Sequence, residues 1–391
     1  MIHPRVFLSL LCSALACQAE LKLAPVFSDH MVLQRGIPAP IWGAANADEK
    51  VVVSFGSQTL TVRADADGEW RAVLKSLTAS TSGSALHVES GGDAVRLSDV
   101  VVGDVWVCSG QSNMAFKLPK CVGGEADAEA ASDPLLRLNA KDRWAPCTGA
   151  AARDVSGVAY YFARLLRKQN PAVPIGLLQR AVGGTPVEFW TPADKLARVP
   201  YCEKTLGLFQ GQHGHAAQIA DYNRAVRAWK RQVKAEGRKE AGPRPKPPVD
   251  PDTMVLSGIY DSASVGRLWR QHLQPLAGYG IRGAIWYQGE RNTKSGEANA
   301  RAYRPMLANM ITSWREAWGQ GDFPFLAVQL PTFAGGSPNW KIVQEAQAQA
   351  VRDVPNAGYI DIRDLPDGGL HPKDKKPVGE RLARLAMKSL D

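Results

Sequence analysis

A serine in a glycine-containing turn follows one of the most apolar runs in the chain. The run from Val100 to Val107 is typical of a buried strand, and the letters Cys-Ser-Gly-Gln-Ser-Asn-Met follow it at positions 108–114. Glycine permits a tight turn, and backbone N–H groups at the start of a following helix can bind a developing oxyanion. Ser112 is therefore a candidate nucleophile, although a serine in this place could also simply cap a helix.

A histidine near the C-terminus offers a base for this serine. Of the seven histidines, only His371 stands in a glycine-rich turn before a helical pattern, in the segment Asp367 to Pro372. A serine hydroxyl needs a base within hydrogen-bond reach, and that base needs an acid that fixes its tautomer. Ser112 and His371 together indicate acyl transfer, whereas His371 alone would be a loop residue without a role.

Two further blocks follow apolar runs. The paired glycines Gly183 and Gly184 would let a backbone N–H approach a substrate closely, although Gly-Gly before Thr-Pro alone indicates only a turn. The other block places Gln288 and Glu290 directly after a buried strand-like run. Polar side chains in such a position need partners, and a catalytic site needs such groups.

Apolar strands alternating with amphipathic helices would position these groups. Strand-like runs are expected at 100–107, 175–178, 284–286 and 325–328, and helices at 157–169, 300–318, 342–352 and 378–389. This alternation predicts a doubly wound α/β domain with a parallel sheet. Its active site should lie at the carboxyl ends of the strands.

The N-terminal part of the chain has a different pattern. Short alternating runs at 51–55, 59–63 and 70–74, with turn signals at 67–68 and 91–92, predict a small β-sandwich over residues 20–99. The α/β domain is expected over 100–391, with a basic, proline-rich insertion at about 205–255. Residues 1–19 read as a signal peptide and predict a secreted or periplasmic protein, with lipidation at Cys17 as the alternative.

The net charge of +9 is concentrated in one segment. Nine Lys or Arg residues against two Glu residues between Arg224 and Pro248 account for +7 of it. Because no binding motif accompanies this charge, nucleic acid is not an expected partner. No run after the signal peptide is long and apolar enough to span a membrane.

The four cysteines of the mature chain allow disulfides in an exported protein. Cys121 and Cys147 both lie in loop-like sequence and could pair, while Cys108 follows an apolar run and is expected to be buried. The spacing of these residues lacks the paired short intervals of a zinc site. We therefore expect no structural metal.

Taken in order, the blocks resemble the sialate O-acetylesterase family of SGNH hydrolases. The likeness covers most of the mature chain and consists of the segments 27–35, 42–43, 103–106, 110–114, 183–186, 286–290 and 371–373. It implies a flavodoxin-like, three-layer SGNH-hydrolase domain that uses neither a metal nor an organic cofactor. It also implies an acetylated carbohydrate as the substrate.

The resemblance assigns roles residue by residue. Ser112 would attack the acetyl carbonyl, and His371 would take the serine proton and later deliver it to the leaving sugar hydroxyl. Water would then hydrolyse the acetyl-enzyme. The backbone N–H of Ser112, a backbone N–H at Gly183 or Gly184, and the side-chain amide of Gln288 would hold the oxyanion.

The sequence departs from the family pattern in places that affect the site. The family commonly has an acid two or three residues before the histidine, where this chain has glycines. The triad acid is therefore either Asp367, which we favour, or Glu290. Arg291 replaces the usual serine after the glutamate, and with Asn292 it is a candidate substrate-binding residue. Arg291 could recognise a carboxylate or pair with Glu290, and we favour the pairing.

Other functions stay open at this stage. Within the esterases, the substrate could be a sialic acid or an acetylated plant or algal polysaccharide such as xylan or xyloglucan. A glycoside hydrolase using Glu290 and Asp367 would leave Ser112 unexplained. A carbohydrate-binding protein would stack sugars on Trp42 or Trp70, but core packing is the preferred interpretation of both tryptophans.

Overall fold

The computed structural model describes residues 21–140, 142–203, 224, 228, 265–366 and 368–388. The predicted signal peptide and most of the predicted basic insertion lie outside these residues. The strands are β1 Lys22–Leu23, β2 Val32–Gln34, β3 Ala39–Ala44, β4 Lys50–Phe55, β5 Gln58–Arg63, β6 Glu69–Leu74, β7 Ser80–Ser90, β8 Asp93–Gly110, β9 Ser132–Asn139, β10 Trp144–Thr148, β11 Ile175–Ala181, β12 Gly283–Tyr287, β13 Phe325–Val328 and β14 Ala357–Ile360. The longer helices are α3 Gly157–Gln169, α8 Glu297–Trp318, α9 Trp340–Ala350 and α10 Lys376–Lys388, and the short ones are α1 Gly124–Glu129, α2 Gly149–Ala152 and α4 Ala193–Leu196.

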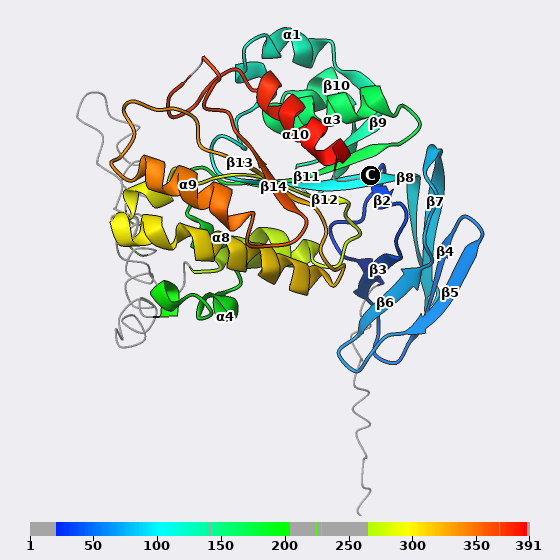
Figure 1. Ribbon diagram of the computed structural model, residues 1–391. Coiled ribbons are helices and arrows are strands. Elements are labelled where there is room, and N and C mark those ends of the chain that lie inside the picture. The colour runs from blue at the N-terminus through cyan, green and yellow to red at the C-terminus, as the bar shows by residue number, and fades with distance from the viewer. Residues whose placement is uncertain are drawn as a thin grey trace, which may run out of the picture.

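Strand β8 runs through both parts of the molecule. Its first half pairs antiparallel with β7, and its second half lies between β11 and β12, parallel to both. The burial of its residues changes accordingly, from partly exposed before Val100 to buried from Val100 to Gly110. The predicted boundary at residue 99 therefore falls inside a continuous strand, which Figure 1 shows passing from the sandwich into the central sheet.

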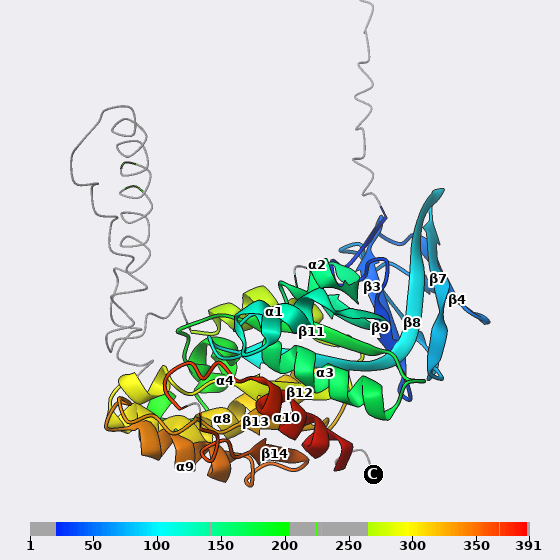
Figure 2. The same cartoon turned by 90° about the horizontal axis from the view of Figure 1, so that it is seen from above.

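Helices cover both faces of the central sheet, whose strand order is β10-β9-β11-β8-β12-β13-β14. Helices α3 and α10 pack together on one face, and α8 and α9 pack together on the other (Figures 1 and 2). Side chains of β8 alternate between the two layers, because Trp106 and Cys108 join the core under α3 and α10 whereas Val105 and Val107 join the core under α8 and α9. The predicted three-layer α/β fold is confirmed.

The four long helical patterns are helices in the structure, and α3 has the predicted bounds. Buried residues recur along α10 at Val378, Leu382, Ala383 and Ala386, which is the spacing of one helix face. Among the described residues, no helix has both the length and the apolar character that crossing a bilayer requires.

The N-terminal part is a small sandwich of two sheets. One sheet has the order β1-β3-β6, and the other contains β4, β5, β7 and the first half of β8. Along β4, Val51, Val53 and Phe55 are buried and alternate with more exposed residues, as expected of a half-buried strand. Gly68 and Gly91 have φ angles of +81° and +56°, which left-handed turns require. The predicted sandwich before the α/β domain is thus confirmed.

The two tryptophans considered for sugar binding are packing residues. Trp70 is only 3% exposed. The ring of Trp42 meets Phe27 edge-on, with 4.7 Å between the centroids, and the Arg71 guanidinium lies 5.3 Å from the Trp42 ring centroid. These contacts support the interpretation of both residues as core.

The cysteines do not pair as the sequence suggested. Cys108, Cys121 and Cys147 are all buried free thiols, so the bridge that Cys121 and Cys147 could have formed is not present. Cys147 lies on β10 opposite Asp133 of β9, while the Cys121 thiol faces the carbonyl of Lys117 at 3.6 Å. Burial raises the pKa of the Cys121 and Cys147 thiols to about 12. The prediction that Cys108 is buried is confirmed.

Candidate active site

Ser112 and His371 come into contact at the carboxyl edge of the sheet. Ser112 stands two residues after the end of β8, and His371 stands on the loop before α10. Ser112 Oγ and His371 Nε2 are 2.8 Å apart. Ser112 is half-buried and His371 is exposed, so solvent reaches the pair. At this distance the hydroxyl can donate its proton to the imidazole, which is the step that activates a serine nucleophile.

The surroundings of His371 favour its neutral form. Burial lowers the pKa of His371 below the ordinary histidine value, and the positive charge of Lys375 lowers it further. The imidazole therefore stays unprotonated to a lower pH than that of a free histidine. This matters because only the neutral ring can accept the serine proton.

Backbone donors for an oxyanion surround Ser112. Within the described part of the chain, the backbone N–H groups of Ser112, Gly183 and Gly184 donate to no protein acceptor. A Cβ atom added to Gly183 would lie 3.5 Å from the Ser112 Cβ, so the glycine loop runs beside the nucleophile. Gly184 has a φ of +74°, which glycine adopts without steric cost. Val182 N–H donates to the Gly110 carbonyl at 3.1 Å and holds this loop against the end of β8.

Gln288, the predicted side-chain oxyanion donor, lies in a buried hydrogen-bond cluster. Its Nε2 donates to Asn292 Oδ1 at 2.8 Å, to the Thr185 carbonyl at 3.1 Å and to Gln111 Oε1 at 3.3 Å. Its Oε1 accepts from the Tyr303 hydroxyl at 2.8 Å, and the side chain has no exposed surface. Because the amide hydrogens have protein acceptors in this arrangement, the oxyanion role of Gln288 stays a prediction.

Asn292, the other predicted substrate-binding residue, lies in the same buried cluster as Gln288. Its Nδ2 donates to Glu188 Oε2 at 2.8 Å and to Asn299 Oδ1 at 3.0 Å, and its Oδ1 accepts from Val187 N–H at 3.1 Å as well as from Gln288. The side chain is fully buried. With both ends of the amide occupied away from solvent, this arrangement argues against the predicted contact of Asn292 with a sugar.

The triad acid is not found among the described residues. Glu290, one of the two candidates, accepts a hydrogen bond from Asn113 on Oε1, and its Oε2 has no hydrogen-bond partner in the described structure. It makes no hydrogen bond with His371. Asn113 Nδ2 also donates to the Leu370 carbonyl at 2.9 Å, so Glu290 reaches the histidine loop only through Asn113. The preferred candidate, Asp367, lies outside the described residues.

The expected pair between Arg291 and Glu290 is wrong. Glu290 is only 2% exposed and bonds to Asn113, whereas Arg291 is partly exposed. The backbone N–H of Arg291 donates to Gln111 Oε1 at 3.2 Å.

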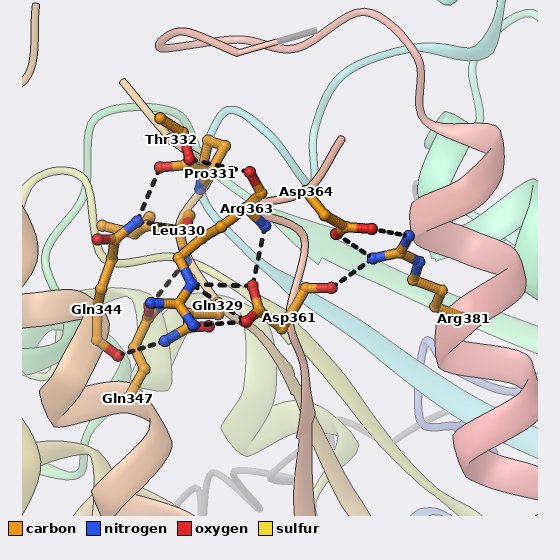
Figure 3. A network of polar contacts seen from close by, with 10 residues as sticks. All are labelled: Gln329, Leu330, Pro331, Thr332, Gln344, Gln347, Asp361, Arg363, Asp364 and Arg381. Carbon is orange, nitrogen blue, oxygen red and sulfur yellow. Dashed lines mark hydrogen bonds and ion pairs between the residues drawn. The ribbon is translucent and has the colours of Figure 1, made fainter. Parts of the chain in front are cut away.

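Loops after β13 and β14 fix the segment before α10. The Thr332 carbonyl accepts from Gly369 N–H at 3.0 Å, and the Thr332 hydroxyl donates to the Arg363 carbonyl at 3.0 Å. Arg381 of α10 bonds to Asp364 through two guanidinium nitrogens, at 2.6 and 2.7 Å (Figure 3). The loop after β13 therefore holds the histidine segment at Gly369, and α10 holds the loop after β14 at Asp364.

Comparison with known proteins assigns the chain to a family. A model of carbohydrate esterases, described as sialic acid-specific acetylesterase, matches residues 102–236 and 262–388, which include Ser112 and His371. The chain belongs to this family. It is 27% identical to the sialate O-acetylesterase of Rattus norvegicus over 92% of this chain and 72% of that protein. The Homo sapiens sialate O-acetylesterase is also 27% identical, over 92% and 69%.

A solved structure agrees with this assignment. The crystal structure of a carbohydrate acetylesterase from Xanthomonas citri matches with a TM-score of 0.72 and 29% identity, over 94% of this chain and 74% of that one. The resemblance inferred from the motifs is confirmed. The protein is accordingly a carboxylic ester hydrolase of the sialic acid-specific acetylesterase family.

Two buried residues near the catalytic pair were not predicted as site residues from the sequence. Asn113 directly follows the nucleophile, and Lys375 lies four residues after His371. Both are fully buried. The sequence holds a signal for Lys375, because it precedes the buried positions Val378 and Leu382 by three and seven residues and so continues the buried face of α10.

Proposed function

We propose that the protein is a serine esterase that removes O-acetyl groups from sugars, with Ser112 as nucleophile and His371 as general base. The observation that carries this proposal is the 2.8 Å distance between Ser112 Oγ and His371 Nε2. Family membership supports the reaction class. The free backbone N–H groups near Ser112 support acyl transfer, because a tetrahedral oxyanion needs such donors.

The reaction runs in two halves. Ser112 Oγ attacks the acetyl carbonyl while His371 Nε2 takes the hydroxyl proton, and the resulting oxyanion is held by the Ser112 N–H and by an N–H at Gly183 or Gly184. The proton then passes from His371 to the sugar oxygen, the sugar departs as an alcohol, and the acetyl group remains on Ser112 as an ester. Water then attacks the acetyl-enzyme with His371 again as the base and releases acetate.

The named relatives support sialic acid as the first substrate to test. The rat and human proteins are sialate O-acetylesterases, and the Xanthomonas citri protein is a carbohydrate acetylesterase. Acetylated plant or algal polysaccharide is the alternative substrate. Glycosidic cleavage is disfavoured because Glu290 is buried and could not flank a glycosidic bond.

Export is part of the proposal. It depends on the apolar, signal-like composition of residues 1–19 in the sequence. N-terminal sequencing of the mature protein checks it, and we expect the chain to begin near Glu20.

Acetate release from a panel of acetylated sugars tests the proposed function. The panel contains O-acetyl sialic acid, acetylated xylan and acetylated xyloglucan, and the proteins are the wild type, Ser112→Ala and Ser109→Ala. Ser109 is the matched control because it is a buried serine on β8 whose Oγ has no hydrogen-bond partner in the described structure.

We expect the wild type and Ser109→Ala to release acetate and Ser112→Ala to be inactive. Release from O-acetyl sialic acid supports the sialate assignment, and release only from the polysaccharides replaces the substrate but keeps the mechanism. Undiminished activity of Ser112→Ala would contradict the proposal.

A further inference from the structure

Lys375 occupies a place that is costly for a cation. Its side chain has no exposed surface, and its carbonyl accepts the Gly379 N–H at 3.0 Å, so it stands at the N-terminus of α10. Burial of a charge is unfavourable, and the positive end of a helix dipole adds to the penalty. An apolar residue of similar size would be cheaper to bury here. A cation buried at such a cost calls for a role beyond packing.

The contacts of Lys375 lead to the catalytic pair through one side chain. Lys375 Nζ donates to Asn113 Oδ1 at 2.5 Å. The other end of the same amide donates to Glu290 Oε1 and, at 2.9 Å, to the Leu370 carbonyl. Charge complementarity fixes the orientation of Asn113, since its oxygen faces an ammonium and its nitrogen faces a carboxylate. Asn113 directly follows Ser112 and bonds to Leu370, which directly precedes His371, so it links the two catalytic segments.

The remaining surroundings of Lys375 suit a protonated amine. Its Nζ lies 5.2 Å from the ring centroids of both Phe116 and Tyr287, a distance at which aromatic rings attract a cation. In the part of the chain that the structure describes, the titratable groups whose pKa responds to this charge include Glu290 after β12, Cys121 before α1 and His371. Burial raises the pKa of Glu290, and the bond from Asn113 and the charge of Lys375 counter this rise.

We propose that Lys375 is a positioning residue for catalysis: through Asn113 it holds the His371 loop against Ser112. This inference rests on the proposed function of Ser112 and His371. Two effects are expected to follow. Loss of the Asn113 contact loosens the 2.8 Å hydrogen bond of the pair, and loss of the charge removes an influence that opposes protonation of His371.

Removal of the Lys375 charge changes the pKa of His371. The Lys375 charge and burial both lower the pKa of His371, so removing the charge raises this pKa. The acidic limb of the profile of kcat/KM against pH reports the base in the free enzyme. Without Lys375 that limb moves to higher pH, and the enzyme loses activity under mildly acidic conditions where the wild type still works.

Two substitutions separate position from charge. Lys375→Met removes both the donor and the charge, while Lys375→Gln removes the charge but keeps an amide N–H that can donate to Asn113. The matched control is Lys376→Met, which removes the same charge from the exposed neighbouring position. Acetate release gives kcat and KM between pH 4 and 9, a range of about two units or more on each side of the ordinary histidine pKa. Thermal unfolding checks the fold of each variant.

We expect Lys375→Met to lower kcat by about tenfold to a hundredfold, because a small misplacement of catalytic groups has effects of this size, and to leave KM nearly unchanged. Lys375→Gln should recover part of kcat. Both variants should show an acidic limb at higher pH, and Lys376→Met should match the wild type.

An acidic limb that stays in place in both Lys375 variants would overturn the inference, and so would a failure of both variants to fold, which would leave Lys375 a role in stability alone. Ser112→Ala, measured in the same assay, separates this outcome from failure of the proposed function. If Ser112→Ala is inactive and the limb does not move, only the inference about Lys375 falls. If Ser112→Ala is active, the proposed function falls with it.

Discussion

Two groups of polar residues lie at the same edge of the sheet and differ in solvent exposure and in hydrogen bonding. Ser112 and His371 make one side-chain hydrogen bond to each other and are accessible to solvent. Gln288 and Asn292 are fully buried, and their amides bond to protein groups at both ends. The first group can exchange protons and bonds with a substrate. In this arrangement the second group holds the strand ends in place.

The comparison separates chemistry from scaffolding. A reactive group needs access to substrate and a hydrogen-bond donor or acceptor that is free to bind it. A buried amide cluster is stable only when the donors and acceptors of each member are hydrogen-bonded. Substitutions in the two groups should therefore have opposite effects on activity and stability.

His371→Gln should abolish turnover without destabilising the fold. Loss of the general base lowers kcat by about 10⁴-fold or more, as for other serine triads. The side chain is exposed, so the melting temperature should stay close to that of the wild type. The measurements are acetate release and thermal unfolding. His87→Gln, at an exposed position on β7, is the control and should change neither, and retained turnover in His371→Gln would remove the distinction between the two groups.

Asn292→Ala should destabilise the fold and have little effect on turnover. The substitution removes one buried partner each from Glu188 and Gln288 and leaves the Val187 N–H without an acceptor, which lowers the free energy of unfolding by about 2–4 kcal/mol. Chemical denaturation measures this loss. Asn170→Ala, at an exposed position after α3, is the matched control and should be nearly neutral. A rise in KM at unchanged stability would instead restore Asn292 as a substrate-binding residue.

Gly184→Ala should have a moderate effect on both properties. No atom lies within 4 Å of the added Cβ, so the cost comes from the left-handed backbone alone, about 1–2 kcal/mol. Relief of that strain would move the N–H groups beside Ser112, and kcat should fall by about tenfold. Gly56→Ala has an equally open site and a φ of +58° in the sandwich, so it should lose similar stability but no activity. Equal kcat values for the two variants would argue against an oxyanion site in this loop.

A reducing agent should change neither the activity nor the stability of the protein. Cys121 and Cys147 are buried free thiols in the structure. Thermal unfolding with and without dithiothreitol should give the same melting temperature. A clear decrease on reduction would indicate a stabilising disulfide and reverse our correction.

The sequence allowed prediction of what depends on pattern, and it failed where side-chain direction decides. The apolar runs ending at Val107 and Val328 are typical of strands buried on both faces and are strands in the structure, and α3 has its predicted bounds. By contrast, Asn292 follows a buried strand just as Gln288 does, and nothing in that position tells whether the amide faces the substrate or the core. The burial of Lys375 was likewise missed, because lysine is ordinarily a surface residue.

The central claim is that Ser112 is the nucleophile, and covalent trapping tests it most directly. The wild type, Ser112→Ala and Ser109→Ala are treated with an organophosphate ester, and the intact proteins and their peptides are analysed by mass spectrometry. We predict one adduct on Ser112 in the wild type and in Ser109→Ala, loss of acetate release in step with labelling, and no adduct on Ser112→Ala. An adduct on Ser112→Ala, or inactivation with Ser112 unmodified, would contradict the account.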